Sequence, residues 1–276
     1  MHQEWIDEGL ILKVGRFREI DCWVRFFSPN QGLVTAMAFG GAKSRRRFCG
    51  CLDALNSVLF KVRFFPAKGR HVLEEGTLLR GFPRLRQDAA RTGLAANCLQ
   101  FVQALRISPE DAPAIHKLLM ETLDALDQAE NVSSVFTQLF RAKICFTQGY
   151  APELDSCMIC GRLVAEEPRS GDQGLRSADG HAVDRFGCKM GRFSGLTLAM
   201  ETGGVYCAHC PPVAGHQVHI GPETRSILSQ LASSGPRHWA DMSISRTTRG
   251  ELFQMVDGYV RRHLGLCWRN GRFVAG

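Results

Sequence analysis

Four cysteines in two C-x-x-C pairs carry the strongest chemical signal in this sequence. Cys157 and Cys160 form the first pair, and Cys207 and Cys210 form the second. Each pair places two thiolates on one tight turn, and four thiolates are a typical donor set of a closed, tetrahedral Zn²⁺ site. A redox-active C-x-x-C would need a βαβ context, which is missing here. We therefore predict one structural zinc ion held by these four cysteines.

The segment between the two pairs is longer than in a usual zinc ribbon. Residues 161–206 are rich in Gly, Arg, Ser and Asp and show little periodicity, whereas a ribbon separates its pairs by roughly 15 to 20 residues. We expect an insertion of loops and short hairpins that is the most mobile part of the chain. Cys188 and His209 are spare donors, and either one could replace a cysteine ligand.

A second signal is a basic stretch between glycines and a phenylalanine. Lys43, Arg45, Arg46 and Arg47 occupy four of the five positions 43–47. In a β context this pattern is typical of a loop that follows a phosphate backbone, with nearby aromatic rings available for base stacking. A solvated turn is the alternative for any single arginine, but the whole cluster favours nucleic acid. The weaker candidates for DNA contact are Arg16, Arg18, Lys61 and Arg63.

The charge distribution supports this interpretation. Residues 1–86 hold 15 Lys and Arg against 8 Asp and Glu, and they account for the whole formal net charge of +7. A local positive field attracts phosphates, although a solubility surface is the alternative explanation. No stretch approaches the ~18 apolar residues of a membrane span or the apolar core of a secretory signal. We expect a cytoplasmic protein with no membrane partner. In such a protein, the 11 cysteines are expected to be metal ligands or free thiols rather than members of disulfide bonds.

The apolar pattern divides the chain into four expected parts of an α+β multidomain protein. Short runs of Val, Ile and aromatic residues in 1–80 predict four or five strands of a small barrel or sandwich. Helical spacing in 81–152 predicts a bundle of three amphipathic helices. The range 153–215 holds the cysteine pairs and the insertion. The range 216–276 shows two more helical patterns, expected to pack on the bundle.

Two enzyme motifs are incomplete. Lys43 and Ser44 resemble the end of a phosphate-binding P-loop, but Ala42 and Met37 stand where that loop needs glycine. A histidine and a glutamate at the N-terminus followed by a C-x-x-C resemble a zinc-deaminase signature, but the proline before the cysteine pair is absent. Four cysteine ligands would also leave zinc no open coordination position. We therefore expect that the protein is not an enzyme.

The order of these parts resembles the bacterial recombination mediator family RecO. The motifs that carry the resemblance are Gly9–Leu12, Gly32–Gly40 running into the arginines, Gly149–Asp155 before the first cysteine pair, Gly203–Tyr206 before the second, and Leu264-Gly265. The chain departs from the family at the insertion 161–206 and at Trp268-Arg269-Asn270, where the family tends to carry Lys-Ser-Arg.

The resemblance implies an N-terminal OB-fold in a DNA repair and recombination protein of the nucleoid. It implies binding of single- and double-stranded DNA, annealing of complementary strands, and, with RecR, loading of RecA onto strands coated by single-strand-binding protein (SSB). The alternative, from a different functional class, is a zinc-ribbon nucleic-acid-binding protein that acts on RNA or in transcription.

The helical part offers a candidate site for the acidic C-terminal tail of SSB. Phe140 would lie at a hydrophobic groove, with Arg141 and Lys143 nearby as partners for carboxylates. The alternative is a plain helical bundle with Phe140 in its core.

Overall fold

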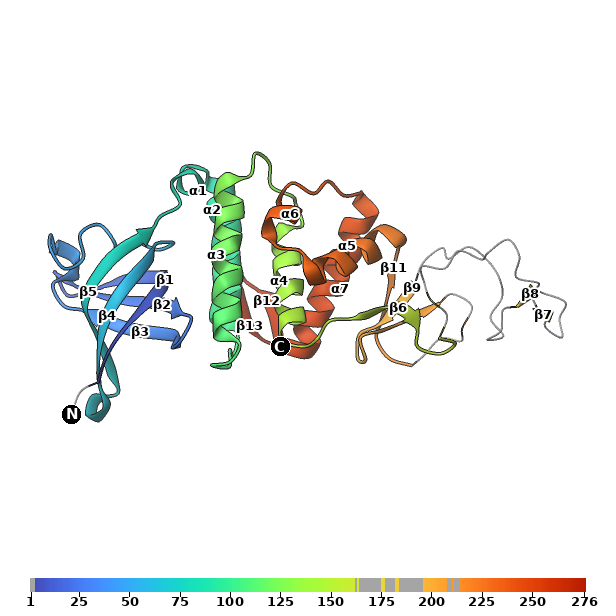
Figure 1. Cartoon of the computed structure of the whole chain (residues 1–276), viewed down its shortest axis with the longest axis horizontal. Coiled ribbons are helices and arrows are strands. Elements are labelled where there is room, and N and C mark those ends of the chain that lie inside the picture. Colours follow the sequence, from blue (N-terminus) through green and yellow to red (C-terminus); the bar gives the residue numbers. More distant parts are fainter. Residues whose placement is uncertain are drawn as a thin grey trace. The chain divides into compact units, whose positions relative to one another are not determined.

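The computed structural model describes residues 3–161, 163, 175–176, 182–183, 196–207, 210 and 214–276 (Figure 1). These residues form two compact units, one made of 1–132 with 236–241 and the other of 133–235 with 242–276. Most of the insertion 161–206, whose mobility we predicted, lies outside the described residues, as do Cys188 and His209.

A closed five-stranded barrel opens the first unit, and it has the strand order β1-β2-β3-β5-β4. All pairings are antiparallel except that of β3 with β5, which is parallel and closes the barrel. The long first strand pairs with β4 through its first half and with β2 through its second half. Its pairing with β2 shifts register between Ile11 and Lys13. The predicted N-terminal OB-fold barrel is thereby confirmed. Its strands are β1 (Gln3–Phe17), β2 (Asp21–Ser28), β3 (Gly32–Ala38), β4 (Ser57–Phe65) and β5 (Arg70–Arg80).

Alternating side chains build the core of this barrel. In β4, Val58, Phe60 and Val62 are buried, whereas Leu59 and Lys61 between them face outward, as expected of a half-buried strand. Phe26 of β2 packs on Phe60 with ring centroids 4.8 Å apart. Two residues of the long β3–β4 connection, Phe48 and Cys51, are buried in the same core, and they anchor that connection to the barrel.

Helices complete the first unit. They are α1 (Pro83–Gln87), α2 (Ala89–Ala104), α3 (Ala112–Gln128) and α6 (Pro236–Ala240). The Asp88 carboxylate caps α2 by accepting from the backbone N–H groups of Ala90 and Arg91. The Arg91 guanidinium then donates to the carbonyl oxygens of Leu126 and Glu130, which ties α2 to the end of α3.

The second unit combines helices with small sheets. α4 (Phe136–Thr147) and α5 (Pro222–Ser233) both pack on α7 (Arg246–Leu264). A four-stranded sheet has the order β11 (Gln217–Ile220), β9 (Leu196–Ala199), β10 (Gly204–Cys207) and β6 (Glu153–Cys157). The chain ends in a hairpin of β12 (Leu266–Arg269) and β13 (Arg272–Ala275), which the sequence analysis did not anticipate. A further short pair is β7 (Leu175–Arg176) with β8 (Ala182–Val183).

Helices α2, α3 and α4 occupy the three predicted helical stretches, and α5 and α7 the two predicted near the C-terminus. The compact units group α2 and α3 with the barrel but α4 with the C-terminal helices. The four domain boundaries inferred from the sequence stay predictions. In the described part of the chain, no helix is both long and apolar enough to cross a membrane.

Candidate metal centre and nucleic-acid interface

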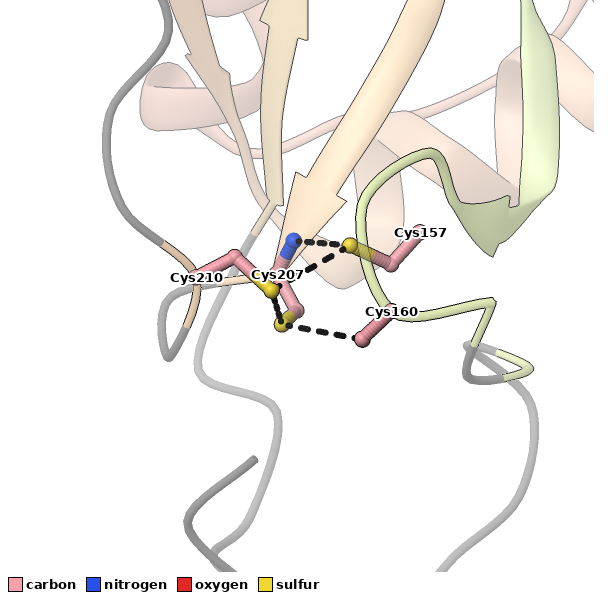
Figure 2. Close-up of side chains that lie close together, drawn as sticks. All are labelled: Cys157, Cys160, Cys207 and Cys210. Atoms are coloured by element: carbon pink, nitrogen blue, oxygen red, sulfur yellow. Dashed lines mark hydrogen bonds between the residues drawn. The ribbon is translucent and has the colours of Figure 1, made fainter. Parts of the chain in front are cut away.

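Two neighbouring strands position the four cysteines. Strand β6 ends at Cys157 and β10 ends at Cys207; the two strands run parallel, with Val205 opposite Cys157. A tight turn follows each strand: the Gly161 N–H donates to the Cys157 carbonyl, and the Cys210 N–H donates to the Cys207 carbonyl. Gly161 has a φ of 69°, the left-handed conformation that glycine adopts most easily. The turns bring the second cysteine of each pair back beside the first (Figure 2).

The sulfur positions fit a tetrahedral metal ion. The Sγ–Sγ distances are 3.7 Å from Cys157 to Cys210, 3.9 Å from Cys160 to Cys207 and 3.5 Å from Cys207 to Cys210. All four sulfur atoms lie within 4.8 Å of one another. A regular tetrahedron with Zn–S bonds of ~2.3 Å would separate them by about 3.8 Å. The distances exceed the ~2.05 Å of a disulfide bond, so the cluster is compatible with a metal site.

The surroundings of Cys157 favour its thiolate. Burial raises the pKa of this thiol, but the backbone N–H groups of Cys160, Cys207 and Ile159 lower it to about 7. The Cys207 nitrogen lies 3.4 Å from the Cys157 sulfur. Backbone donors therefore stabilise negative charge on a sulfur that could ligate a metal.

Sequence reasoning assigned Gly204 no structural role beside this cluster. A Cβ atom there would lie 1.5 Å from the sulfur of Met158, which occupies the turn between Cys157 and Cys160. The close approach of Met158 to β10 therefore requires glycine at position 204. The adjacent Gly203-Gly204 pair was the available signal, because strand glycines often mark a close approach of another part of the chain.

The basic cluster lies on the β3–β4 connection that Phe48 anchors. Lys43, Arg45, Arg46 and Arg47 are all exposed. The Arg47 guanidinium donates to the Phe39 carbonyl and lies 5.2 Å from the Phe48 ring centre. Arg47 therefore braces the connection, and the other three basic side chains extend from it into solvent.

An aromatic surface on the outer side of β1, β2 and β3 was missed by the sequence analysis. The Trp23 ring lies against Gly15 of the neighbouring strand, where a Cβ atom would be 2.2 Å from the ring. The Lys13 Nζ lies 5.7 Å from the centre of the Trp23 ring, and Arg25 pairs across the strands with Lys13. The sequence signal for this surface was Trp23 at an outward position of a strand, followed two positions later by the basic Arg25.

Arg16 and Arg18 lie next to this surface, at the β1–β2 turn. Both are exposed. Arg18 has a φ of 61° in that turn, and its guanidinium lies 5.3 Å from the Phe17 ring centre. The β1–β2 loop and the β2–β3 face are the usual oligonucleotide-binding parts of an OB-fold. The role of these two arginines in DNA binding stays a prediction.

Lys61 and Arg63 lie on a different side of the barrel, the outer face of β1, β4 and β5. Arg63 forms ion pairs with Glu4 at 2.8 Å and with Glu74 at 3.0 Å. Lys61 lies 3.7 Å from the Glu4 carboxylate. Their positive charges are thus partly balanced locally, and their role in DNA binding stays a prediction.

The three candidate partner residues make contacts inside the second unit. Phe140 is fully buried. Arg141 is 7% exposed, pairs with Asp257 at 3.4 Å and lies 4.8 Å from the Phe273 ring centre. The Lys143 ammonium donates to the carbonyl oxygens of residues 231 and 232, near the C-terminal end of α5, where a cation is favourable. Binding of an acidic tail at these residues stays a prediction, and it would require these contacts to open.

Comparisons with known proteins cover both units. The family model described as Recombination protein O N terminal matches residues 1–82, and the model described as Recombination protein O C terminal matches residues 86–272. The chain is 40% identical over 270 residues to DNA repair protein RecO of Nitratidesulfovibrio vulgaris, with 98% of each chain covered. It is 39% identical over 273 residues to DNA repair protein RecO of Solidesulfovibrio magneticus, which covers 98% of this chain and 99% of that one.

Proposed function

This chain belongs to the RecO family of DNA repair and recombination proteins, and we propose that it is a non-enzymatic mediator that binds single- and double-stranded DNA. In this proposal it anneals complementary strands in the cytoplasm, at the nucleoid. With RecR, it helps to load RecA onto DNA coated by SSB, whose acidic tail it contacts. Family membership favours this function over a zinc ribbon that acts on RNA or in transcription.

The observation that carries the DNA-binding proposal is the exposed basic cluster beside an aromatic strand face. Lys43, Arg45 and Arg46 extend from a connection that Phe48 anchors in the barrel core. The half-buried Trp23 offers a ring for base stacking on the outer strand face. Phosphate contacts together with aromatic stacking are the usual basis of single-strand binding without sequence preference.

The salt dependence of binding tests this assignment. Replacing Lys43, Arg45 and Arg46 by Ala should flatten the slope of log K against log salt by up to about 2, because each lost contact to a single strand contributes about 0.7. Affinity should fall about equally for all sequences, since phosphate contacts carry no base information. Replacing Lys61 and Arg63 by Ala should flatten the slope less than this triple replacement does, because carboxylates partly balance the charges of those two residues. An unchanged slope in a folded triple variant would refute the assignment.

We also propose that the four cysteines hold one structural zinc ion. The sulfur distances near the tetrahedral value and the all-thiolate donor set support it. Bound zinc would join the turns that follow β6 and β10 and so supply folding energy to that sheet. Metal analysis of protein purified under reducing conditions should find one zinc ion per chain, and Cys160→Ala should abolish that stoichiometry. Absence of zinc, with all four thiols open to alkylation, would contradict the proposal.

Strand annealing separates the mediator from the alternative function. We expect the protein to accelerate annealing of complementary DNA strands coated with SSB. The triple variant of the basic cluster should lose this acceleration in parallel with its DNA affinity. A protein that binds RNA tightly and leaves this annealing rate unchanged would favour the alternative.

A further inference from the structure

The C-terminal hairpin is a two-stranded ribbon with a tight turn at one end and a closing hydrogen bond at the other. Its turn consists of Asn270 and Gly271, which have positive φ values of 51° and 76°, as in the type I′ turns that match the twist of hairpin strands. At the other end, the Gly276 N–H donates to the Gly265 carbonyl at 2.8 Å. The hairpin thus presents its side chains from a fixed backbone, which lowers the entropy lost when a ligand binds.

Trp268 is the exposed aromatic residue of this ribbon. It lies opposite Phe273, with the ring centroids 4.7 Å apart. Phe273 is only 9% exposed, and the Arg141 guanidinium lies over its ring at 4.8 Å. Trp268 nevertheless keeps 45% of its surface exposed. A large ring that is braced by a neighbour and open to solvent is suited to stacking on a base.

Two arginines face each other at the turn of the same ribbon. Arg269 and Arg272 form the cross-strand pair next to the Trp268–Phe273 pair, and both are exposed. Like charges directly opposite each other destabilise a hairpin. Within the described part of the chain, neither arginine forms an ion pair. An anion bound between them would relieve this repulsion.

The end of α7 extends the positive charge beyond the hairpin. Residues 246–276 contain six arginines against Glu251 and Asp257 as the acidic residues. Arg261 and Arg262 line an open hollow of about 480 Å³ together with His216 and the acidic Asp257. The Arg261 side chain also lies beside Gly276 at the base of the hairpin. Arginines therefore outnumber acidic residues around the hairpin, and Arg261 adds a positive charge at its base.

We propose that the C-terminal hairpin is a second contact for single-stranded DNA, with a base stacked on Trp268 and a phosphate bound by Arg269 and Arg272. Neighbouring side chains point to opposite faces of a strand, but this ribbon is only two strands wide. A DNA strand that passes over its turn can therefore meet the ring on one face and the guanidinium groups on the other. The ring can be covered by a base, whereas the narrow ribbon offers an acidic peptide little apolar surface.

This inference rests on the proposed function and extends it to the second unit. Two separate single-strand contacts would allow one chain to hold two strands, which is what annealing requires.

Substitutions at the hairpin test the contact. The binding of a short oligothymidylate and of an abasic strand of equal length would be measured in the Lys43, Arg45 and Arg46 triple variant, where the barrel contributes less. Trp268→Ala should weaken oligothymidylate binding by about 5- to 100-fold and leave abasic-strand binding unchanged, whereas Trp268→Phe should retain most of the affinity. Arg269→Glu with Arg272→Glu should weaken both. The matched control is Phe253→Ala, an aromatic residue of α7 that is 38% exposed and should have no effect.

Photo-cross-linking supplies a second, direct readout. A 5-iodouracil oligonucleotide should form an adduct with Trp268 in the unaltered protein, detectable by mass spectrometry. Unchanged oligothymidylate affinity in Trp268→Ala, with adducts confined to residues 3–80, would overturn the inference but leave the barrel assignment intact. Failure of the barrel assignment would instead appear as an unchanged salt slope in the triple variant. If the arginine substitutions abolish binding of an acidic peptide but leave both DNA strands unaffected, the hairpin is a peptide site and the inference is wrong.

Discussion

At position 15, the lack of a side chain allows the Trp23 ring to lie across strand β1. A Cβ atom at Gly15 would be 2.2 Å from a ring atom, so any larger residue must displace the ring. Glycine weakens a strand on its own, but a cross-strand aromatic ring can compensate for that weakness. Gly15 and Trp23 therefore act as a cross-strand pair, in which the glycine leaves room for the ring to lie against strand β1.

We predict that Gly15→Val displaces Trp23 and weakens single-strand binding severalfold. The added methyl groups should also lower the free energy of unfolding by roughly 1–3 kcal/mol, as overpacking does. Oligonucleotide titration and denaturant unfolding measure the two effects. Thr77→Val, at an exposed position of β5 opposite Leu59 and away from this face, is the control and should change neither. Unaltered affinity together with an unaltered near-ultraviolet tryptophan signal would contradict the prediction.

Single residues differ in how far the sequence could predict their role. The spacing of Cys157, Cys160, Cys207 and Cys210 predicts their convergence, because each pair lies on one short turn. The roles of basic residues depend on which face of the barrel they occupy. Arg63 has carboxylate neighbours that come from two other strands, Glu4 of β1 and Glu74 of β5, and no local pattern in β4 indicates them.

At the scale of elements, helix α3 packs on the barrel strand β2 through a buried histidine. The His116 ring lies 6.1 Å from the Phe27 ring, and its exposed fraction is 6%. Burial lowers the pKa of His116 below its usual value, and the nearby carboxylates of Glu8 and Asp7 oppose this shift. Protonation of this histidine should therefore weaken the contact between the helix and the barrel.

We predict that His116 makes the protein less stable at acidic pH. Because its pKa is lower in the folded state, the unfolded chain binds more protons as the pH falls below about 6.5. The stability that neutral His116 provides is thus present above that pH and declines as the pH falls toward the folded pKa, by at most about 1.4 kcal/mol per pH unit. His116→Gln should make the unfolding free energy less dependent on pH between 7 and 5. His71 and His263, whose pKa values are also lowered by burial, would contribute to the remaining dependence.

The sequence predicted elements well where one periodicity continues over many residues. Helices α2, α3 and α4 follow their apolar spacing, and β4 follows its alternation of buried and exposed residues. The C-terminal hairpin was missed because its strands have four residues each, too few to establish a period. The Asn270-Gly271 pair between them was the overlooked signal, since Asn-Gly is strongly preferred in type I′ hairpin turns.

At the scale of the whole molecule, the two compact units should differ in their dependence on metal. The barrel has an extensive apolar core that includes Phe26, Phe60 and Leu73. The cysteine cluster forms a small core of its own, with Cys157 and Cys207 buried and the other two cysteines packed against them. Metal binding should therefore supply much of the local stability around β6 and β10. The site does not exist in the unfolded chain, so the free energy of metal binding stabilises the folded state.

We predict that zinc removal loosens the cysteine-bearing sheet and leaves the barrel folded. A chelator, or Cys160→Ala, should reduce the hydrogen-exchange protection of amides in β6 and β10, whereas amides in β1–β5 should keep theirs. Cys49→Ala, which removes an exposed cysteine of the β3–β4 connection, is the matched control and should leave both regions protected. DNA binding that depends on Lys43, Arg45 and Arg46 should persist after zinc removal, because the barrel core does not include the cluster. Equal loss of protection in the barrel strands would show instead that the two units unfold together.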